Sequence, residues 1–257
     1  MCDLTKKPGA VSFNGKNIYF QTQNRREKNR IKSFARKEPG TLEWIQGFKK
    51  GEVFYDIGAN IGIYSLPAAS MVGKSGKVYA FEPHIFSFNK LVKNIVLNDF
   101  GNTIEACSTP LTENLETAHF NYTTLESGST GSQLGHTKTF DDNQFTPVFK
   151  ELKLGVSIDI LIENYNWQVP DHIKIDVDGN EANIIKGMKN LLSGKFLKKP
   201  ISIQIEVNPA EHASTIELMT NANYAQASCH FTATGQRLIN EGHDPKKYPY
   251  NIIFKPK

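Results

Sequence analysis

Residues 53–62 read Val-Phe-Tyr-Asp-Ile-Gly-Ala-Asn-Ile-Gly, and this stretch says more about the architecture of the 257-residue chain than any other. Its first half is an apolar run of the kind that forms a buried strand, and its second half is a glycine-rich turn. Glycine has no Cβ and tolerates unusual φ angles, so such a turn lets the backbone come close to a ligand. We expect a helix at residues 63–71, whose free N–H groups would suit a carboxylate.

Strands and helices alternate on both sides of this stretch, which is the pattern of a parallel sheet with crossover helices. The expected strands are residues 53–57, 77–81, 103–108, 173–177 and 201–207. The expected helices are residues 63–71, 87–97, 182–192 and 210–219. Residues 225–231 and 251–255 would close the sheet as an antiparallel edge hairpin. The predicted fold class is therefore α/β, with a Rossmann-like, mostly parallel sheet.

The length suits one domain with a large insertion, because a single core rarely serves more than about 250–300 residues. Residues 1–50 are expected to form an extension with a hairpin around Asn14-Gly15, a basic helix, and a short helix at 42–48 capped by Thr41. Residues 51–257 would form the main domain. Its insertion, residues 109–171, would either cover an acceptor or be a surface excursion, with one further element at 156–162.

The turn at residues 58–62 lacks the glycine pattern of a dinucleotide site. A G-x-G-x-x-G motif accommodates a pyrophosphate, but Asn60 and Ile63 stand at its second and third glycine positions, which argues against NAD. Asp56, just before the turn, suits a ligand with a cationic end. S-adenosylmethionine has such an end, with an ammonium and a sulfonium group.

A second acid, Glu82, follows the next expected strand, 20 residues after Gly62. A carboxylate in that place can accept hydrogen bonds from both hydroxyls of an adenosine ribose, and Pro83 fixes the exit of the chain. The predicted cofactor-binding residues are Asp56, Gly58, Asn60, Gly62, Glu82 and Pro83.

Three blocks of the chain resemble those of the FkbM-type methyltransferases. They are residues 56–62 (Asp-Ile-Gly-Ala-Asn-Ile-Gly), 76–83 (Gly-Lys-Val-Tyr-Ala-Phe-Glu-Pro) and 174–181 (Lys-Ile-Asp-Val-Asp-Gly-Asn-Glu), the last followed by Gly187. Ile205-Glu206-Val207 is similar to a later strand end of that family. The resemblance implies a class I methyltransferase fold, S-adenosylmethionine as cofactor, and methylation of a hydroxyl oxygen on a sugar, glycan or natural product. Where the family usually has Val-Glu-Gly, this chain has Val177-Asp178-Gly179.

The carboxylates of Asp176, Asp178 and Glu206 follow or end two expected central strands, so they should meet at one edge of the sheet. Methyl transfer to an alcohol needs a group that takes up the hydroxyl proton. Asp176 is the first candidate and Glu206 the second, and Lys174 would reduce the charge on either. The three acids would alternatively hold Mg²⁺ or Ca²⁺, although a metal is not favoured. Asp178 with Glu181 would otherwise cap the following helix.

Basic residues gather at positions 25–37, which hold seven basic residues, one acidic residue and four of the five arginines of the chain. Arginine suits bidentate contact with phosphate or carboxylate. The segment would be either a solvated helix face or a binding surface. One alternative function is therefore methylation of RNA, with the segment tracking phosphates. Another is a non-catalytic module that binds S-adenosylmethionine.

Histidines and cysteines offer fewer candidates. His119, His136 and His172 lie in or beside the insertion and would be either bases or solvated side chains. The three cysteines are far apart in sequence, which favours neither a disulfide framework nor a zinc site, and Cys107 is expected to pack as a small buried residue. The N-terminus lacks the apolar stretch of a secretory signal, so we expect a cytoplasmic protein.

Overall fold

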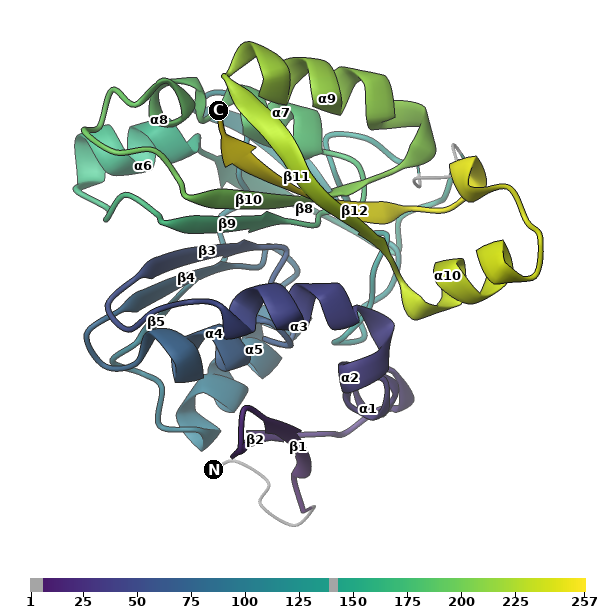
Figure 1. Ribbon diagram of the computed structural model, residues 1–257. Helices are drawn as coiled ribbons and strands as arrows, with labels where there is room; N and C mark the ends of the chain where they lie inside the picture. Colours follow the sequence, from purple (N-terminus) through teal and green to yellow (C-terminus); the bar gives the residue numbers. More distant parts are fainter. Residues whose placement is uncertain (1–6, 139–142) are drawn as a thin grey trace.

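The computed structural model describes residues 7–138 and 143–257, which form a mixed sheet flanked by helices (Figure 1). Within these residues the main sheet has seven strands in the order β11-β12-β10-β9-β3-β4-β5. Their bounds are β3 Val53–Ile57, β4 Lys77–Phe81, β5 Ile104–Cys107, β9 His172–Ile175, β10 Ser202–Val207, β11 Tyr224–Phe231 and β12 Tyr250–Pro256. Strands β10, β9, β3, β4 and β5 are parallel. The α/β class and the mostly parallel sheet are confirmed.

Helices cover both faces of this sheet, because parallel strands must be buried on each side. One face carries α3 Pro39–Gln46, α4 Ser65–Val72 and α5 Ile85–Leu97 (Figure 1). The other carries α6 Ile158–Tyr165, α7 Glu181–Lys186, α8 Lys189–Ser193 and α9 His212–Asn221. Successive strand residues point to opposite faces, so Tyr55 and Ile57 pack in the core beneath α6 to α9, and Phe54 packs in the core beneath α3 to α5.

The predicted strands agree with the structure to within two residues at each end. β9 stops two residues early, so Asp176 and Val177 belong to the turn that follows it. The helix predicted at 182–192 is instead two short helices, α7 and α8, separated at Gly187. The chain passes so close to the insertion there that a Cβ on Gly187 would lie 2.3 Å from the carbonyl oxygen of Thr112.

The two C-terminal strands form the antiparallel edge of the sheet. β12 pairs antiparallel with β10, and β11 pairs antiparallel with β12, so the last strand of the chain lies inside the edge. The connection from β11 to β12 carries α10 Ala233–Asn240 and the 3₁₀ turn η2 Pro245–Lys247. The predicted edge hairpin is therefore present, with a helix in its connection.

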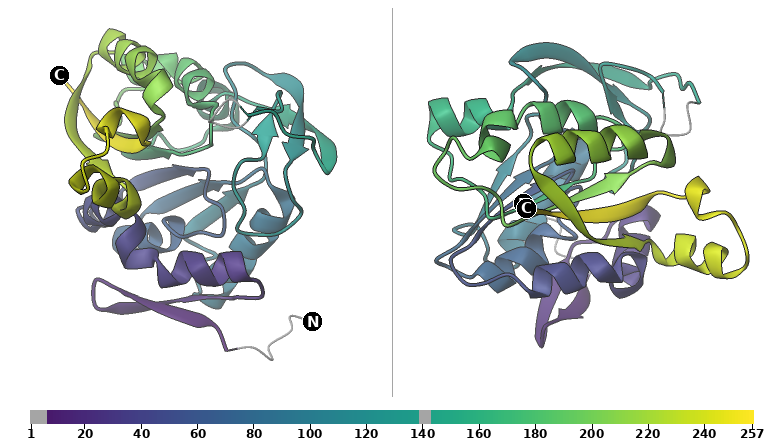
Figure 2. Two further views of the ribbon diagram at one scale, coloured as in Figure 1. Left: turned by 90° about the vertical axis from the view of Figure 1, so that its right-hand side faces the viewer. Right: turned by 45° about the horizontal axis from the view of Figure 1, so that its top comes forward.

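The insertion at 109–171 has its own small sheet. Its described part contains β6 Glu116–Tyr122, β7 Gln133–Leu134 and β8 Phe149–Gly155 in the order β7-β6-β8. The element predicted at 156–162 is the start of α6. In the left view of Figure 2 the insertion (teal) stands beside the main sheet and the N-terminal segment (purple) lies below it.

The N-terminal segment is part of the same core as the main sheet. It consists of the hairpin β1 Gly9–Phe13 and β2 Lys16–Phe20, the helices α1 Arg25–Lys32 and α2 Phe34–Lys37, and α3. Phe13, Ile18 and Phe34 are buried in the core that contains Phe54. The hairpin prediction is confirmed, but Thr41 is not a helix cap, because α3 already begins at Pro39, a residue that fits the first turn of a helix.

No helix among the described residues has the length and apolar character needed to cross a membrane.

Candidate active site

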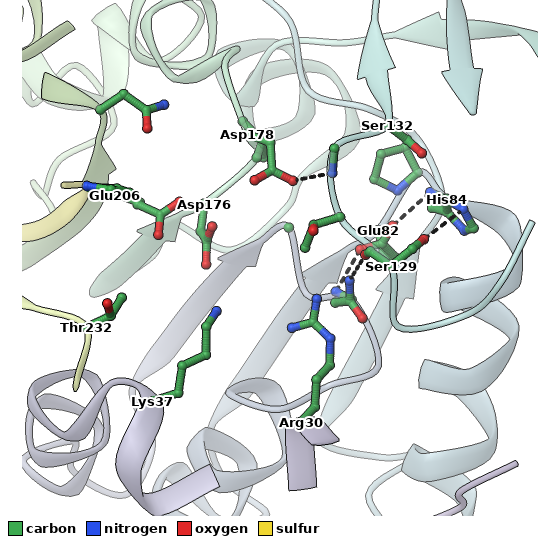
Figure 3. Close-up of a pocket in the computed structure, with 18 of the residues that line it drawn as sticks. Arg30, Lys37, Glu82, His84, Ser129, Ser132, Asp176, Asp178, Glu206 and Thr232 are labelled. Carbon is green, nitrogen blue, oxygen red and sulfur yellow. Dashed lines mark hydrogen bonds between the residues drawn. The ribbon is translucent and has the colours of Figure 1, made fainter. Parts of the chain in front are cut away.

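A cavity of about 300 Å³ opens at the carboxyl ends of the parallel strands (Figure 3). Its wall combines the turns after β3, β4, β9 and β10 with parts of α1, α2, the insertion and the C-terminal connection. It brings together six of the eight residues predicted from the sequence: Gly58, Asn60, Glu82, Pro83, Asp176 and Glu206. The two that do not line it are Asp56 and Gly62.

Gly58 lies where the turn after β3 meets the turn after β9. Its φ is +85°, and a Cβ there would lie 1.8 Å from the carbonyl oxygen of Asp176. No side chain fits in that space, and L residues rarely adopt that φ. Glycine at this position therefore allows two turns of the cavity wall to touch.

Asp56 points away from the cavity, because its side chain alternates with those of Tyr55 and Ile57. It is fully buried on the α4 side of the sheet, where Ser65 Oγ donates a 2.5 Å hydrogen bond to its Oδ2. Burial raises the pKa of Asp56, although the nearby ammonium group of Lys174 opposes this. Asp56 therefore does not line the cavity, and its role in binding a cofactor stays a prediction.

Most N–H groups of the glycine turn donate hydrogen bonds within the protein. Gly58 and Ala59 donate to the carbonyl oxygen of Phe81 over 3.0 and 2.9 Å. Asn60 donates to Glu82 Oε2 over 2.7 Å. The following helix, α4, begins only three residues after the turn. The N–H groups of these three residues are therefore not available to a ligand, whereas the prediction of free N–H groups concerned the helix that follows and stays a prediction.

Glu82 is held at the end of β4 by two backbone N–H groups. His84 N donates to Oε1 over 2.8 Å, and Asn60 N donates to Oε2 over 2.7 Å. Burial raises the pKa of Glu82 to about 7, although these two hydrogen bonds oppose the shift. Each carboxylate oxygen keeps a further lone pair, so Glu82 can still accept hydrogen bonds from two hydroxyls.

The insertion contributes the loop at residues 126–132, which is tied to the cavity wall at several points. Asn60 Nδ2 donates to the carbonyl oxygen of Ser129 over 2.7 Å, and Ser129 Oγ lies 3.3 Å from His84 Nε2 (Figure 3). Gly131 N donates to Asp178 Oδ2 over 2.8 Å. This part of the insertion is therefore a wall of the cavity.

Three carboxylates, those of Glu38, Asp176 and Glu206, bring oxygen atoms within 4.8 Å of one another. Two lysines accompany them. Lys174 Nζ lies 2.5 Å from Asp176 Oδ2, and Lys37 Nζ lies 3.1 Å from Glu38 Oε1. The cluster differs from the predicted one, because it contains Glu38 in place of Asp178.

These charges move the pKa values of the cluster in opposite directions. Burial alone would raise the pKa of Asp176, but the ammonium groups of Lys174 and Lys37 hold it well below its usual range. The charge of Asp176 then raises the pKa of Glu206, and burial raises it further. Burial would lower the pKa of Lys174, but Asp176 and Glu38 keep it raised. Asp176 is therefore the firmly ionised acid, and Glu206 is the stronger base.

Asp178 and Glu181 have separate positions beside this cluster. Glu181 Oε1 accepts hydrogen bonds from Val177 N and Gly179 N over 3.2 and 3.3 Å at the start of α7. Asp178 instead binds the insertion loop through Gly131. α7 begins after Asn180 without a side-chain cap, so the alternative that these two acids cap it is wrong, and Glu181 instead binds the turn before the helix.

An alternation of polar and apolar residues in two central strands indicates this cluster, but the prediction did not use it. In β9, His172 and Lys174 alternate with isoleucines, and in β10, Ser202, Gln204 and Glu206 alternate with Ile and Val. A central parallel strand is normally apolar on both faces. The alternation therefore indicates a buried polar layer, which in the structure faces α3 and leads up to the cavity.

Other residues were singled out in the sequence but lie elsewhere. His172 is buried at the start of β9, where its ring nitrogens contact Ser202 and Glu52, so it is not a base in the cavity. His119 and His136 do not line the cavity either, whereas His84, which was not singled out, does. Cys107 packs against the core but is only partly buried, whereas a buried residue was expected. Cys2 lies outside the described residues.

The sheet order, the cavity at the carboxyl edge and the acid at the end of β4 define an S-adenosylmethionine-dependent methyltransferase of the class I fold. A solved S-adenosylmethionine-dependent O-methyltransferase from Thermotoga maritima shares the fold, with a TM-score of 0.50 and 11% identity over 98% of this chain and 78% of that one. Within this class the chain belongs to the FkbM methyltransferase family. The sequence model described as the Methyltransferase FkbM domain matches residues 56–225, well over half of the chain.

Other relatives are more similar in sequence but cover less of the chain. The hexuronic acid methyltransferase AglP of Haloferax volcanii is 24% identical over 190 residues, which are 73% of this chain and 71% of that protein. The methyltransferase sdnD of Sordaria araneosa is 28% identical over 153 residues, 52% of this chain and 59% of that protein. The solved methyltransferase FkbM from Methylobacillus flagellatus has a TM-score of 0.47 and 20% identity over 80% of this chain, which spans only 44% of that one.

Proposed function

We propose that this enzyme methylates a hydroxyl oxygen of a sugar or glycan, or of a natural product with similar hydroxyl groups. The name of the relative AglP, a hexuronic acid methyltransferase, supports a sugar acceptor. The wall of the cavity supports a polyhydroxylated acceptor, because it presents Ser129, Thr130, Ser132, Asn208 and Thr232. Hydroxyl and amide groups of this kind suit hydrogen bonds to sugar hydroxyls.

The observation that carries the proposal is the pair Asp176 and Glu206 in the cavity wall. An alcohol is a poor nucleophile, so a base must take up its proton as the new C–O bond forms. Glu206 is our candidate for this base, because in its ionised form the neighbouring charge of Asp176 makes it more basic than an ordinary glutamate; it must therefore lose its own proton before it takes up that of the hydroxyl. Asp176 stays ionised beside Lys174 and orients the hydroxyl. This reverses the order in which the two acids were expected to act.

The residues around the cavity fit S-adenosylmethionine. Glu82 keeps free lone pairs for the ribose hydroxyls, and Asn60 Oδ1 is buried without a hydrogen-bond partner among the described residues. Gly58 and Pro83 would pack against the cofactor from the turns after β3 and β4. When bound, S-adenosylmethionine supplies an electrophilic methyl group. The chain itself holds the cofactor, orients the hydroxyl and takes up its proton at Glu206 Oε.

A methyl-transfer screen tests the proposal. The purified enzyme is given labelled S-adenosylmethionine with a uronic acid oligosaccharide, a neutral oligosaccharide, a polyketide alcohol or a primary amine, and methylated products are identified by NMR. We expect transfer to a sugar hydroxyl. Transfer to the amine alone would overturn the assignment.

The role of Glu206 is tested with the best acceptor. We expect Glu206→Gln to lower kcat by about 10²–10⁴-fold, the usual contribution of general base catalysis, while the affinity for S-adenosylhomocysteine stays within about threefold, well under the tenfold that corresponds to 1.4 kcal/mol. The matched control is Glu163→Gln, which changes an exposed glutamate of α6 that pairs with Lys195. Unchanged kcat in Glu206→Gln would exclude it as the base.

A further inference from the structure

Two cations of the N-terminal segment, Arg30 and Lys37, line the cavity, although the basic segment could equally have been a solvated helix face. Figure 3 shows both side chains pointing into the cavity, Lys37 toward Asp176 and Arg30 toward Glu82. Lys37 already has a partner in Glu38, at 3.1 Å. Arg30 is therefore the cation whose role needs an explanation.

Arg30 is held in place by one of its nitrogens only. Its Nε donates a 2.7 Å hydrogen bond to the carbonyl oxygen of Gly128 in the insertion loop. Among the described residues its two terminal nitrogens have no hydrogen-bond partner, and no carboxylate lies within ion-pair distance of them. A guanidinium fixed at Nε presents two parallel donors in the geometry that a carboxylate accepts.

The helix that carries Arg30 is itself fixed against the same loop. Asn24 caps α1, and its Nδ2 donates to the carbonyl oxygen of Ser127 over 3.0 Å. Glu27 is fully buried, accepts a hydrogen bond from Ser127 Oγ, and pairs with Lys90 at 3.3 Å. This anchoring orders Arg30 before any ligand arrives, so its side chain loses little conformational freedom on binding.

Arg30 also lines a small recess of the cavity between α1–α2 and the glycine turn. The recess is lined by Arg30, Phe34, Lys37, Gly58, Ala59, Asn60, Ile63, Tyr64 and Asp176. Asn60, which lines both the recess and the main cavity, has its Oδ1 buried without a hydrogen-bond partner among the described residues. The two terminal nitrogens of Arg30 and Oδ1 of Asn60 together suit a zwitterion. Its carboxylate would accept hydrogen bonds from Arg30, and its ammonium group would donate to Asn60.

We propose that Arg30 binds the α-carboxylate of S-adenosylmethionine and so makes the N-terminal segment part of the cofactor site. The N–H groups of Gly58, Ala59 and Asn60 are not available for this task, because they donate to Phe81 and Glu82. The recess adjoins Asn60, whose backbone also binds Glu82, the residue placed to hold the ribose. This inference rests on the cofactor site proposed above.

Two ligands separate this role from others. S-adenosylhomocysteine has the amino-acid end, and 5′-methylthioadenosine lacks it but keeps the nucleoside. By isothermal titration we expect Arg30→Gln to weaken the binding of S-adenosylhomocysteine by at least about tenfold, because a charged hydrogen bond is lost. The affinity for 5′-methylthioadenosine should change less than about twofold, since that ligand makes no charged hydrogen bond for Arg30→Gln to remove. Arg30→Lys keeps the charge but not the paired donors, so its affinity for S-adenosylhomocysteine should lie between those of the unchanged enzyme and Arg30→Gln.

The control is Arg26→Gln, one turn earlier on α1, which removes an exposed ion pair with Glu126 of the same loop. It should leave both affinities unchanged. Equal weakening of both ligands by Arg30→Gln would mean that Arg30 only shapes the site, and would overturn the proposal. Unchanged affinity for S-adenosylhomocysteine would overturn it too and leave Arg30 free for an acidic acceptor. Failure of the acceptor screen alone would not affect these binding results, so the two proposals fail separately.

Discussion

Replacing Lys174 with methionine tests whether a buried charge balance holds the site together. Lys174 is fully buried, with its ammonium group 2.5 Å from Asp176 and 4.8 Å above the ring of Tyr64. Methionine fills a similar space but leaves Asp176, Glu38 and Asp56 without their shared counter-ion. Removing one partner of a buried ion pair costs about 3–5 kcal/mol. Since the free energy of unfolding of a domain is only about 5–15 kcal/mol, the variant should lose a large part of its stability.

Urea unfolding followed by circular dichroism, at about pH 8 and about pH 5.5, measures the free energy of unfolding and its pH dependence. Without Lys174, the folded-state pKa of Asp176 should rise above its unfolded value of about 3.9. The folded variant then takes up a proton as the pH falls, before the unfolded chain does, so it is stabilised relative to the unfolded chain. We expect a deficit of about 3 kcal/mol or more at the higher pH, and a smaller deficit at the lower one.

The matched control is Lys195→Met, which removes a half-exposed partner of Glu163. Surface pairs of this kind contribute about 0–1 kcal/mol. If Lys174→Met lost no more stability than Lys195→Met, or lost the same amount at both pH values, the reasoning from buried charge would be refuted.

Three further predictions follow from the cavity wall. Gly58→Ala should abolish binding of S-adenosylhomocysteine, measured by titration, because its Cβ would lie 1.8 Å from a backbone oxygen of Asp176; retained affinity would contradict the account of this turn. The affinity for S-adenosylhomocysteine should rise as the pH increases through about 7, where Glu82 becomes ionised and accepts ribose hydroxyls more strongly, and Glu82→Gln should remove this dependence. Methyl transfer should survive dialysis against EDTA, because Lys37 and Lys174 already offset two of the three clustered carboxylates; activity restored only by added Mg²⁺ would instead point to a metal at Glu38, Asp176 and Glu206.

The sheet was predictable because its strands are marked locally. The strands at 53–57 and 77–81 are short apolar runs bounded by turn residues, and the structure reproduces their bounds. Gly58 and Glu82 were found for the same reason, since each directly follows such a strand. Helix starts were less well predicted, because a proline at the first turn of α3 gives a stronger signal than the threonine chosen as its cap.

The placement of Asp56 was missed because the direction of a side chain depends on its position within the strand. Strand alternation puts Asp56 on the side of Phe54, toward α4, whereas the cavity lies beyond the end of the strand. A count of alternate positions from the buried Phe54 would have given this result. The acid before the turn supports the packing of the helix onto the sheet.

The sequence did not indicate that Glu38 and Arg30 belong to the site, for a different reason. Their partners lie far away along the chain: Asp176 and Glu206 follow Glu38 by 138 and 168 residues, and Gly128 of the insertion loop follows Arg30 by 98 residues. No local pattern marks a residue whose partners are brought together only by the tertiary fold.

The contact between α1 and the insertion loop also bears on how this enzyme could diversify. The family match begins at Asp56, so Arg30, Lys37 and Glu38 stand outside it, yet all three belong to the cavity wall or its carboxylate cluster. Exchange of residues 24–38 together with the loop at 126–132 would change part of the wall and leave every strand unchanged, as long as the residue at position 34 still packs in the core with Phe54. A graft of those two segments between family members would carry part of the binding chemistry with it.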